Sequence, residues 1–390
     1  MFQGKYVFSQ LISLLPKYEF DKCVEKYNGN YRAKDFKCWS QFLCMLFGQL
    51  TYRESISDII NCLSAHNNKI YHLGITNLVA VSTLTRANEK RDWRIYQDFA
   101  YHLIKIVRPL YLKDEDFILE LDNTVYAIDS STIDLCLDTF YWAKFRKNKG
   151  AIKIHTQLDL RGNIPTFIEI TEAKTHDINF LDKIIIEAGA FYIMDKAYID
   201  FERLFAIKEA LAFFVVRAKI NLAHKRLYSR DVDKTTGLIF DQTIKLTGYK
   251  SKHRYPAKIR KIKYYDKEQE KYFYFLTNNF ELNALIITQL YKQRWQIELF
   301  FKWIKQHLKI KSFWGHSQNA VKTQIWIAIS SYLIVSYAKK VLNLNKTIYE
   351  ILQILSISVF DKTLINELFT NIEIQNMSKP DYKQLTLFDL

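Results

Sequence analysis

The chain has 390 residues, enough for two or three domains, and 49% of them are hydrophobic, which excludes a disordered or collagen-like protein. Lysine and arginine number 56 against 41 acids, so the net charge is +15 and nucleic acid is the expected partner. The longest apolar run, 325–338, is too short to cross a bilayer, and the five cysteines form no CxxC pair. We therefore expect a cytoplasmic protein with no membrane partner.

Residues 1–115 are expected to form a helical N-terminal domain. Apolar residues recur at three- and four-residue spacing in Cys38–Leu50, and Ser55 and Ser82 stand where helix N-caps are expected. Basic residues are interspersed along these helices. The domain could be a helical support, or it could bind DNA ends, and the sequence favours neither reading.

From about residue 120 the pattern changes to strands. Three β-rich runs follow one another, and Gly162-Asn163 between the last two predicts a hairpin turn: TVYAIDSS, KIHTQLDL and IPTFIEI. We expect next a helix over 177–188, a strand over 190–198, a short helix and a strand over 212–219. This order predicts an α/β fold, with an RNase H-like mixed-sheet catalytic domain over residues 116–315.

The alternation of strands and helices then stops. Residues from about 220 to 276 are predicted to be a β-rich insertion, and a long helix is expected over Asn283–Leu308. Residues 316–390 are predicted to be a helical C-terminal region and tail, which could serve dimerisation.

Two aspartates follow apolar strand runs. Asp129 follows VYAI and Asp195 follows FYIM. Each alone could be a turn or capping residue, but neighbouring strands lie only about 4.8 Å apart, so the two carboxylates can face each other. Such a pair repels unless a cation or a proton lies between the two groups. Oxygen ligands of this kind suit Mg²⁺ or Mn²⁺, and no set of histidines and cysteines suggests zinc.

The long helix carries a single acid, Glu298, between Tyr291 and Gln306. At about 100° per residue, Glu298 shares one face with Tyr291, Arg294 and Lys305, within an arc of roughly 60°. An Arg–Glu pair on a solvated face is the simpler interpretation. We expect apolar side chains to bury most of the rest of the helix: Trp295, Ile297, Leu299, Phe300, Phe301 and Trp303.

The spacing of these four residues resembles the Y-(2)-R-(3)-E-(6)-K signature of the insertion-sequence-4 family of DDE transposases. Asp129-Ser-Ser-Thr and Asp195-Lys-Ala-Tyr are similar to the two aspartate regions of that family. The resemblance covers residues 120–315 well and the N-terminal helices less specifically.

The resemblance implies a three-carboxylate site of Asp129, Asp195 and Glu298 that holds two Mg²⁺, with Mn²⁺ able to substitute. Water would cut DNA at terminal inverted repeats, and the freed 3′-hydroxyl would then attack target DNA. A homodimer is implied, because two ends are cut and joined together. Two alternatives are an RNase H-like metal-dependent nuclease without strand transfer and a non-enzymatic DNA-binding protein descended from a transposase.

Basic and aromatic residues around this site are the predicted DNA contacts, although a charge run is often only a solvated face. They are Tyr291, Arg294, Trp295 and Lys305 of the long helix, Lys144, Arg146 and Lys149 before it, and Arg217 at a strand end. In relatives that form DNA hairpins, an aromatic residue of the insertion holds a flipped base. The tyrosines that could do so here are Tyr249, Tyr255, Tyr264 and Tyr265.

Overall fold

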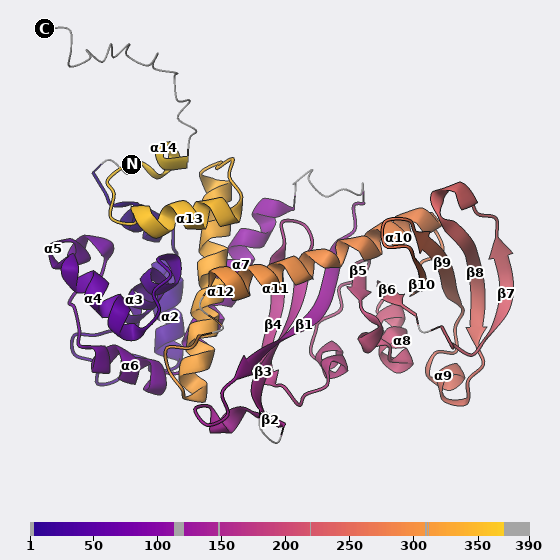
Figure 1. Cartoon of the computed structure of the whole chain (residues 1–390), viewed down its shortest axis with the longest axis horizontal. Coiled ribbons are helices and arrows are strands. Elements are labelled where there is room, and N and C mark those ends of the chain that lie inside the picture. Colours follow the sequence, from indigo (N-terminus) through magenta and orange to yellow (C-terminus); the bar gives the residue numbers. More distant parts are fainter. Residues whose placement is uncertain are drawn as a thin grey trace, which may run out of the picture.

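A computed structural model describes residues 4–112, 121–146, 149–218, 220–308, 310 and 312–369. A helical lobe lies at one end of the molecule and a large sheet at the other, with a long, nearly continuous helix running across the sheet (Figure 1). Within the described ranges, no helix is both long enough and apolar enough to span a membrane.

The N-terminal residues are helical, as predicted. The helices are α1 (Val7–Ile12), α2 (Lys17–Lys26), α3 (Cys38–Leu50), α4 (Ile56–Ala65), α5 (Asn67–Ile70), α6 (Val81–Lys90) and α7 (Arg94–Tyr111). Ser55 caps α4, because its side chain accepts a hydrogen bond from the Asp58 amide. Ser82 was wrongly predicted as a cap: α6 begins one residue earlier, at Val81, and no side chain caps it.

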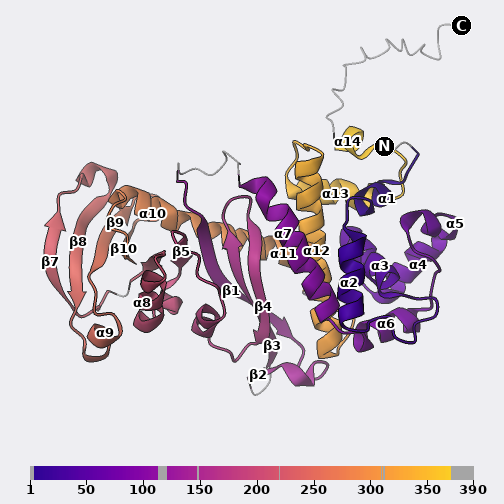
Figure 2. The ribbon, with the colours of Figure 1, turned by 180° about the vertical axis from the view of Figure 1, so that it is seen from behind.

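The C-terminal helices pack against the N-terminal ones. They are α12 (Gln318–Val341), α13 (Ile348–Ser358) and α14 (Ile365–Phe369). Most side chains of α12 are buried, and this helix runs alongside α7 (Figure 2). The two chain ends are also tied by backbone, since the Val7 amide donates to the Asp361 carbonyl at 2.8 Å. The helices on either side of the sheet domain in sequence therefore share one core.

The central sheet has the predicted mixed, RNase H-like arrangement. Its first strands are β1 (Val125–Leu135), β2 (Lys144–Arg146), β3 (Lys149–Asp159), β4 (Ile164–Glu172), β5 (Phe191–Met194) and β6 (Phe213–Arg217). Strand β3 lies antiparallel between β1 and β4, whereas β5 is parallel to both β1 and β6. The predicted hairpin turn between β3 and β4 is confirmed, with positive φ at Gly162 (73°) and Asn163 (55°).

The insertion is β-rich, as predicted, and it extends the same sheet. It comprises β7 (His224–Arg230), β8 (Leu238–Leu246), α9 (Tyr249–Arg254), β9 (Ile259–Asp266) and β10 (Lys271–Thr277). Strand β10 pairs antiparallel with β6, so the main order is β2-β3-β1-β5-β6-β10-β9-β8-β7, and β4 pairs with β3 off this path. Pairing with β10 covers the edge of β6, which would otherwise expose unpaired backbone groups.

Three element boundaries differ from those expected. The helix expected over 177–188 is only a 3₁₀ turn at Asp177–Asp182, followed by the β-branched run 184–186, which favours helix poorly. The strand expected over 190–198 ends at Met194, because a second 3₁₀ turn follows Asp195. The long helix is interrupted at Arg294, which separates α10 (Ala284–Gln293) from α11 (Trp295–His307).

Candidate active site

The two aspartates occupy equivalent places on neighbouring parallel strands. Ile128 of β1 pairs with Met194 of β5, and Asp129 and Asp195 are the next residues on each side. Burial raises the pKa of Asp129 to about 6, and the charges of Glu298 and Asp195 act in the same direction. The acids predicted from the sequence are therefore close enough to influence one another.

Near the break between α10 and α11, the side chains of Tyr291, Arg294 and Glu298 lie over these strands. At the break, the amides of Arg294 and Ile297 each donate to the carbonyl three residues earlier, both at 3.1 Å. The guanidinium of Arg294 then donates to Asp129 Oδ2 (3.2 Å) and to Glu298 Oε1 (2.6 Å). The helix and strand β1 thus meet through one arginine that bonds two acids.

Tyr291 joins the third acid to the same group. Its hydroxyl donates to Asp195 Oδ1 at 3.4 Å. Burial raises the pKa of Tyr291 to about 12, so the hydroxyl keeps its proton at neutral pH and remains a donor. The structure therefore brings together Asp129, Asp195, Glu298, Tyr291 and Arg294.

The arrangement holds an arginine where the resemblance implies metal ions. Among the described residues, no three carboxylate, imidazole or thiol groups lie close enough to hold one metal ion. The reason is visible in the contacts, because Arg294 lies between Asp129 and Glu298. The donor set nevertheless fits Mg²⁺ or Mn²⁺, since all three groups offer carboxylate oxygens and the guanidinium already marks a position that favours a cation.

A fourth acid, missed by the sequence analysis, bonds Ser130, the residue that follows Asp129 on β1. Asp177 Oδ1 accepts hydrogen bonds from Ser130 Oγ (2.6 Å) and Lys153 Nζ (3.0 Å), and His155 lies 3.8 Å away. No spacing pattern marks Asp177, because only the 3₁₀ turn that replaces the expected helix brings it next to β1.

The remaining residues of the signature helix lie around this centre. Lys305 Nζ donates to the Thr132 carbonyl of β1 at 2.8 Å, further along the same strand. Trp295 is 57% exposed and Leu299 is 40% exposed, so the expectation that these two are buried was wrong. At about 100° per residue they lie on the side of α11 away from Ile297, which is buried, as expected, like Phe300.

A cavity of about 420 Å³ lies on the insertion side of Tyr291 and Arg294, the two residues that bond the site's carboxylates. Arg217 lines it and stacks on the Phe273 ring at 4.8 Å. Of the four tyrosines considered for holding a base, Tyr264 lines this cavity, whereas Tyr255 is fully buried. The other lining residues include Phe275, Tyr291, Arg294 and Trp295. Arg217 and Trp295 are thus neighbours of the site, and within the part of the chain that the structure describes no ion pair joins Arg217 to a carboxylate.

The predicted basic contacts before the helix lie elsewhere. Lys144, Arg146 and Lys149 are exposed on the β2–β3 hairpin. Leu135 of β1 pairs with Gly150, six residues beyond Asp129, which places this hairpin roughly 20 Å along the strand from the carboxylate. The structure does not bring these three residues to the acids.

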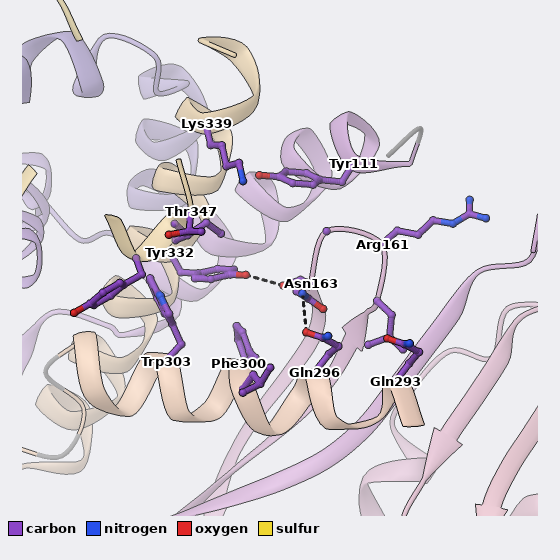
Figure 3. Close-up of a pocket in the computed structure, with 15 residues that line it drawn as sticks. Tyr111, Arg161, Asn163, Gln293, Gln296, Phe300, Trp303, Tyr332, Lys339 and Thr347 are labelled. Carbon is purple, nitrogen blue, oxygen red and sulfur yellow. Dashed lines mark hydrogen bonds between the residues drawn. The ribbon is translucent and has the colours of Figure 1, made fainter. Parts of the chain in front are cut away.

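The opposite face of α11 is neutral and packed (Figure 3). Gln296, Phe300 and Trp303 line a cavity of about 400 Å³ between α11, the β3–β4 turn and α12. Asn163 Nδ2 donates to Gln296 Oε1 (3.3 Å), and Tyr332 Oη donates to the Asn163 carbonyl (2.9 Å). These contacts fix the rotation of α11 and therefore the direction in which Glu298 points.

The fold and these acids define an RNase H-like protein with a DDE-type set of carboxylates. Residues 120–334 match the family described as "Transposase DDE domain", and the chain belongs to this family. Transposases of this kind generally depend on divalent metal ions. Residues 3–76 match a second family, described as "Domain of unknown function (DUF4372)".

Three curated relatives are named as transposases. Putative transposase y4zB of Sinorhizobium fredii is 35% identical over 61% of this chain and 65% of that protein. The probable transposase for insertion sequence element IS5377 of Geobacillus stearothermophilus is 25% identical, over 56% and 58%. The putative transposase for insertion sequence element IS4SA of Synechocystis sp. is 27% identical, over 66% and 71%. The chain spans less than two thirds of the length of the first two.

One solved structure, a piggyBac transposase synaptic complex with hairpin DNA, aligns with a TM-score of 0.45 and 10% identity. The alignment covers 92% of this chain and 78% of that one. This similarity is too low to support an inference about function.

Proposed function

We propose that the chain is a DNA transposase that cuts DNA at terminal inverted repeats and joins the freed 3′-hydroxyl to target DNA. The observation that carries the proposal is the meeting of Asp129, Asp195 and Glu298 around Arg294 and Tyr291. Membership of the DDE transposase family supports it. The reaction takes place in the cytoplasm, and a homodimer carries it out, since two DNA ends are processed together.

Asp129, Asp195 and Glu298 would hold two Mg²⁺, for which Mn²⁺ can substitute. Bound ions supply activation of the attacking oxygen and stabilisation of the leaving oxygen at the scissile phosphate. Arg294 has to release the two carboxylates that it now bonds, and its guanidinium is then free to bind a DNA phosphate close to them.

The other predicted contacts divide into two groups by position. Tyr291 and Lys305 hold phosphates along the face of Glu298, while Trp295 and Arg217 contact DNA at the cavity on the insertion side. The hairpin residues contact DNA further from the scissile bond, because they lie at the far end of β1: Lys144, Arg146 and Lys149. Residues 1–115 bind the DNA ends.

Three single variants test the site: Asp129→Ala, Asp195→Ala and Glu298→Ala. Each should reduce Mg²⁺-dependent cleavage of a labelled end duplex by more than about 100-fold, since even the loss of a residue that only orients a metal ligand costs 10- to 100-fold. End binding should be largely retained. Glu209→Ala, which removes a surface acid already paired with Lys208, should cleave like the unaltered protein. Normal cleavage by Glu298→Ala would refute the assignment.

A second assay separates a transposase from a nuclease on the same fold. An end duplex that already carries the free 3′-hydroxyl is mixed with a supercoiled plasmid, the protein and Mg²⁺. A transposase joins the end to the plasmid, and the product is detected as labelled plasmid. Cleavage of uncut ends without any joining of pre-cut ends would favour the nuclease.

A further inference from the structure

The Asp129 carboxylate is held by two donors from different elements. Arg294 donates to its Oδ2 at 3.2 Å, and the backbone amide of Ser130, the next residue on β1, donates to its Oδ1 at 2.8 Å. The proposed function requires Arg294 to release this carboxylate. The Ser130 amide then orients the carboxylate, so a contact that fixes the Ser130 backbone also fixes the direction of Asp129.

Strand β1 is paired on only one side where Ser130 lies. Its parallel pairing with β5 ends at Ile128, opposite Met194, whereas its antiparallel pairing with β3 continues to Leu135. Within the described ranges, Ser130 therefore has a strand partner on the β3 side alone. Backbone with fewer packed neighbours opens locally at a lower cost in free energy, so this part of β1 needs another contact to stay rigid.

The side chain of Ser130 makes that further contact. Its hydroxyl donates to Asp177 Oδ1 at 2.6 Å, and Lys153 Nζ donates to the same oxygen at 3.0 Å. Although burial acts to raise it, these two hydrogen bonds hold the pKa of Asp177 below its ordinary value. Asp177 is therefore ionised at neutral pH, and a hydrogen bond to an ionised acceptor is stronger than one between neutral groups.

The 3₁₀ turn that carries Asp177 is itself anchored to β3. Phe180 of this turn is 1% exposed, and its ring stacks on the His155 ring with the centroids 5.5 Å apart. Lys153 Nζ also donates to the Thr175 carbonyl at 3.0 Å, just before the turn. Because His155 and Lys153 both belong to β3, Asp177 connects the turn and β3 to the unpaired side of β1.

This contact reaches the active site from the other face of the sheet. Successive side chains of a strand point to opposite faces, so the Ser130 hydroxyl and the Asp129 carboxylate leave β1 in opposite directions. Asp177 therefore acts on Asp129 through the backbone of Ser130 and not through the carboxylate itself.

We propose that Asp177 is a positioning residue, which fixes the Ser130 amide and through it the direction of the Asp129 carboxylate. The inference rests on the proposed function, because it takes Asp129 to be a metal ligand. Loss of a residue that orients a metal ligand typically costs about 10- to 100-fold in metal affinity or activity. A residue needed only for folding would change the stability and leave the metal affinity of the folded protein unchanged.

The test is a double-mutant cycle on Mn²⁺ binding by the DNA-free, full-length protein. Asp177→Ala and Ser130→Ala should each weaken Mn²⁺ binding about tenfold in a calorimetric titration. The double variant should also lose only about tenfold, because both changes break the same contact, whereas independent effects would multiply to about 100-fold. Asp129→Ala identifies the part of the binding signal that belongs to this site.

Two further variants serve as controls. Asp182→Ala removes an acid from the same 3₁₀ turn, one that bonds Arg203 at 2.6 Å, and should bind Mn²⁺ like the unaltered protein. Ser130→Thr retains a hydroxyl and should recover most of the affinity that Ser130→Ala loses. Thermal unfolding shows which variants are folded, and Ser130→Ala, which leaves Asp177 and Lys153 in place, tests the contact even if Asp177→Ala does not fold.

Normal Mn²⁺ affinity in Ser130→Ala or in folded Asp177→Ala would overturn the proposal, and so would an equal loss in Asp182→Ala or multiplied losses in the double variant. Absence of any Asp129-dependent Mn²⁺ binding by the unaltered protein would overturn it too, whereas cleavage of an end duplex would still support the proposed function. Asp177-dependent Mn²⁺ binding by a protein that neither cleaves nor joins DNA would refute the proposed function and leave this inference intact.

Discussion

The two faces of helix α11 differ in their contacts: one makes charged contacts and the other makes neutral ones. One face carries Glu298 and, with Arg294 at its start, makes charged contacts to strand β1. The other carries Gln296, Phe300 and Trp303, which make neutral contacts to α12 and the β3–β4 turn (Figure 3). The charged face is partly open, whereas Phe300 is 4% exposed. Packing on one face thus fixes where the acid on the other face points.

This comparison predicts that the two faces can be damaged separately. Phe300→Ala should lower the free energy of unfolding by about 3–5 kcal/mol, because it empties a buried site against the Tyr332 ring, 5.3 Å away. Glu298→Ala removes a partly exposed ion pair, in which the side chains of Glu298 and Arg294 are 35% and 17% exposed, and should cost only about 1 kcal/mol, because Arg294 keeps its bond to Asp129. Chemical denaturation of both variants measures the difference. If Glu298→Ala destabilises the protein as much as Phe300→Ala does, then the two faces of α11 do not differ in their contribution to stability.

Arg294 allows a sharper test of the charged face. Arg294→Ala removes the internal cation that competes for Asp129 and Glu298, so Mn²⁺ should bind the DNA-free protein about tenfold more tightly. Its affinity for DNA should fall, with the salt slope reduced by about 1. Calorimetric titration with Mn²⁺ and salt-dependent DNA binding measure the two effects.

Glu209→Ala provides the comparison, because it removes a surface acid paired with Lys208, away from the site, and should leave Mn²⁺ affinity unchanged. If Arg294→Ala binds Mn²⁺ no better than the unaltered protein, then Arg294 does not compete with metal ions for these carboxylates.

The charged face was largely predictable from sequence, because its residues are only a few positions apart along one helix or one strand. The spacing of Tyr291, Arg294, Glu298 and Lys305 follows from helix geometry alone. The apolar runs before Asp129 and Asp195 likewise predict strands with an acid after the apolar residues, although β1 continues past Asp129 to Leu135 and only β5 ends before its acid. A period of a few residues is sufficient to place such side chains on a common face or at a strand end.

The parts that were missed depend on contacts between distant segments. The sequence predicted a β-rich insertion, but its extension of the sheet depends on pairing between β10 and β6. Asp177 reaches Ser130 only because a 3₁₀ turn replaces the expected helix. The exposure of Trp295 depends on how the helix is rotated by its packing, which no local pattern specifies.

His155 lies 3.8 Å from Asp177, the acid that bonds Ser130 next to Asp129. Burial lowers the pKa of His155 below its ordinary value of 6.5, despite the attraction of Asp177. The unfolded chain then binds the proton more readily, so stability is full above pH 6.5 and falls as the pH drops toward the folded-state pKa. One such group contributes at most about 1.4 kcal/mol per pH unit.

The measurement is the free energy of unfolding at pH values on either side of 6.5. His155→Gln should lose this part of the pH dependence, and His72→Gln, which replaces an exposed histidine, should retain it. An identical pH dependence in His155→Gln and the unaltered protein would show that His155 is not held neutral by its surroundings.

Trp295 lies between the two faces and should show the smallest effect. Because it is 57% exposed, Trp295→Ala should change the free energy of unfolding by no more than about 0.5 kcal/mol. If its ring contacts DNA beside the cavity, end-DNA affinity should fall by about 1 kcal/mol, the lower limit for stacking on a base. Trp295→Phe should restore most of that affinity. A large loss of stability would instead place Trp295 with the packed face, and normal DNA binding would remove it from the proposed contacts.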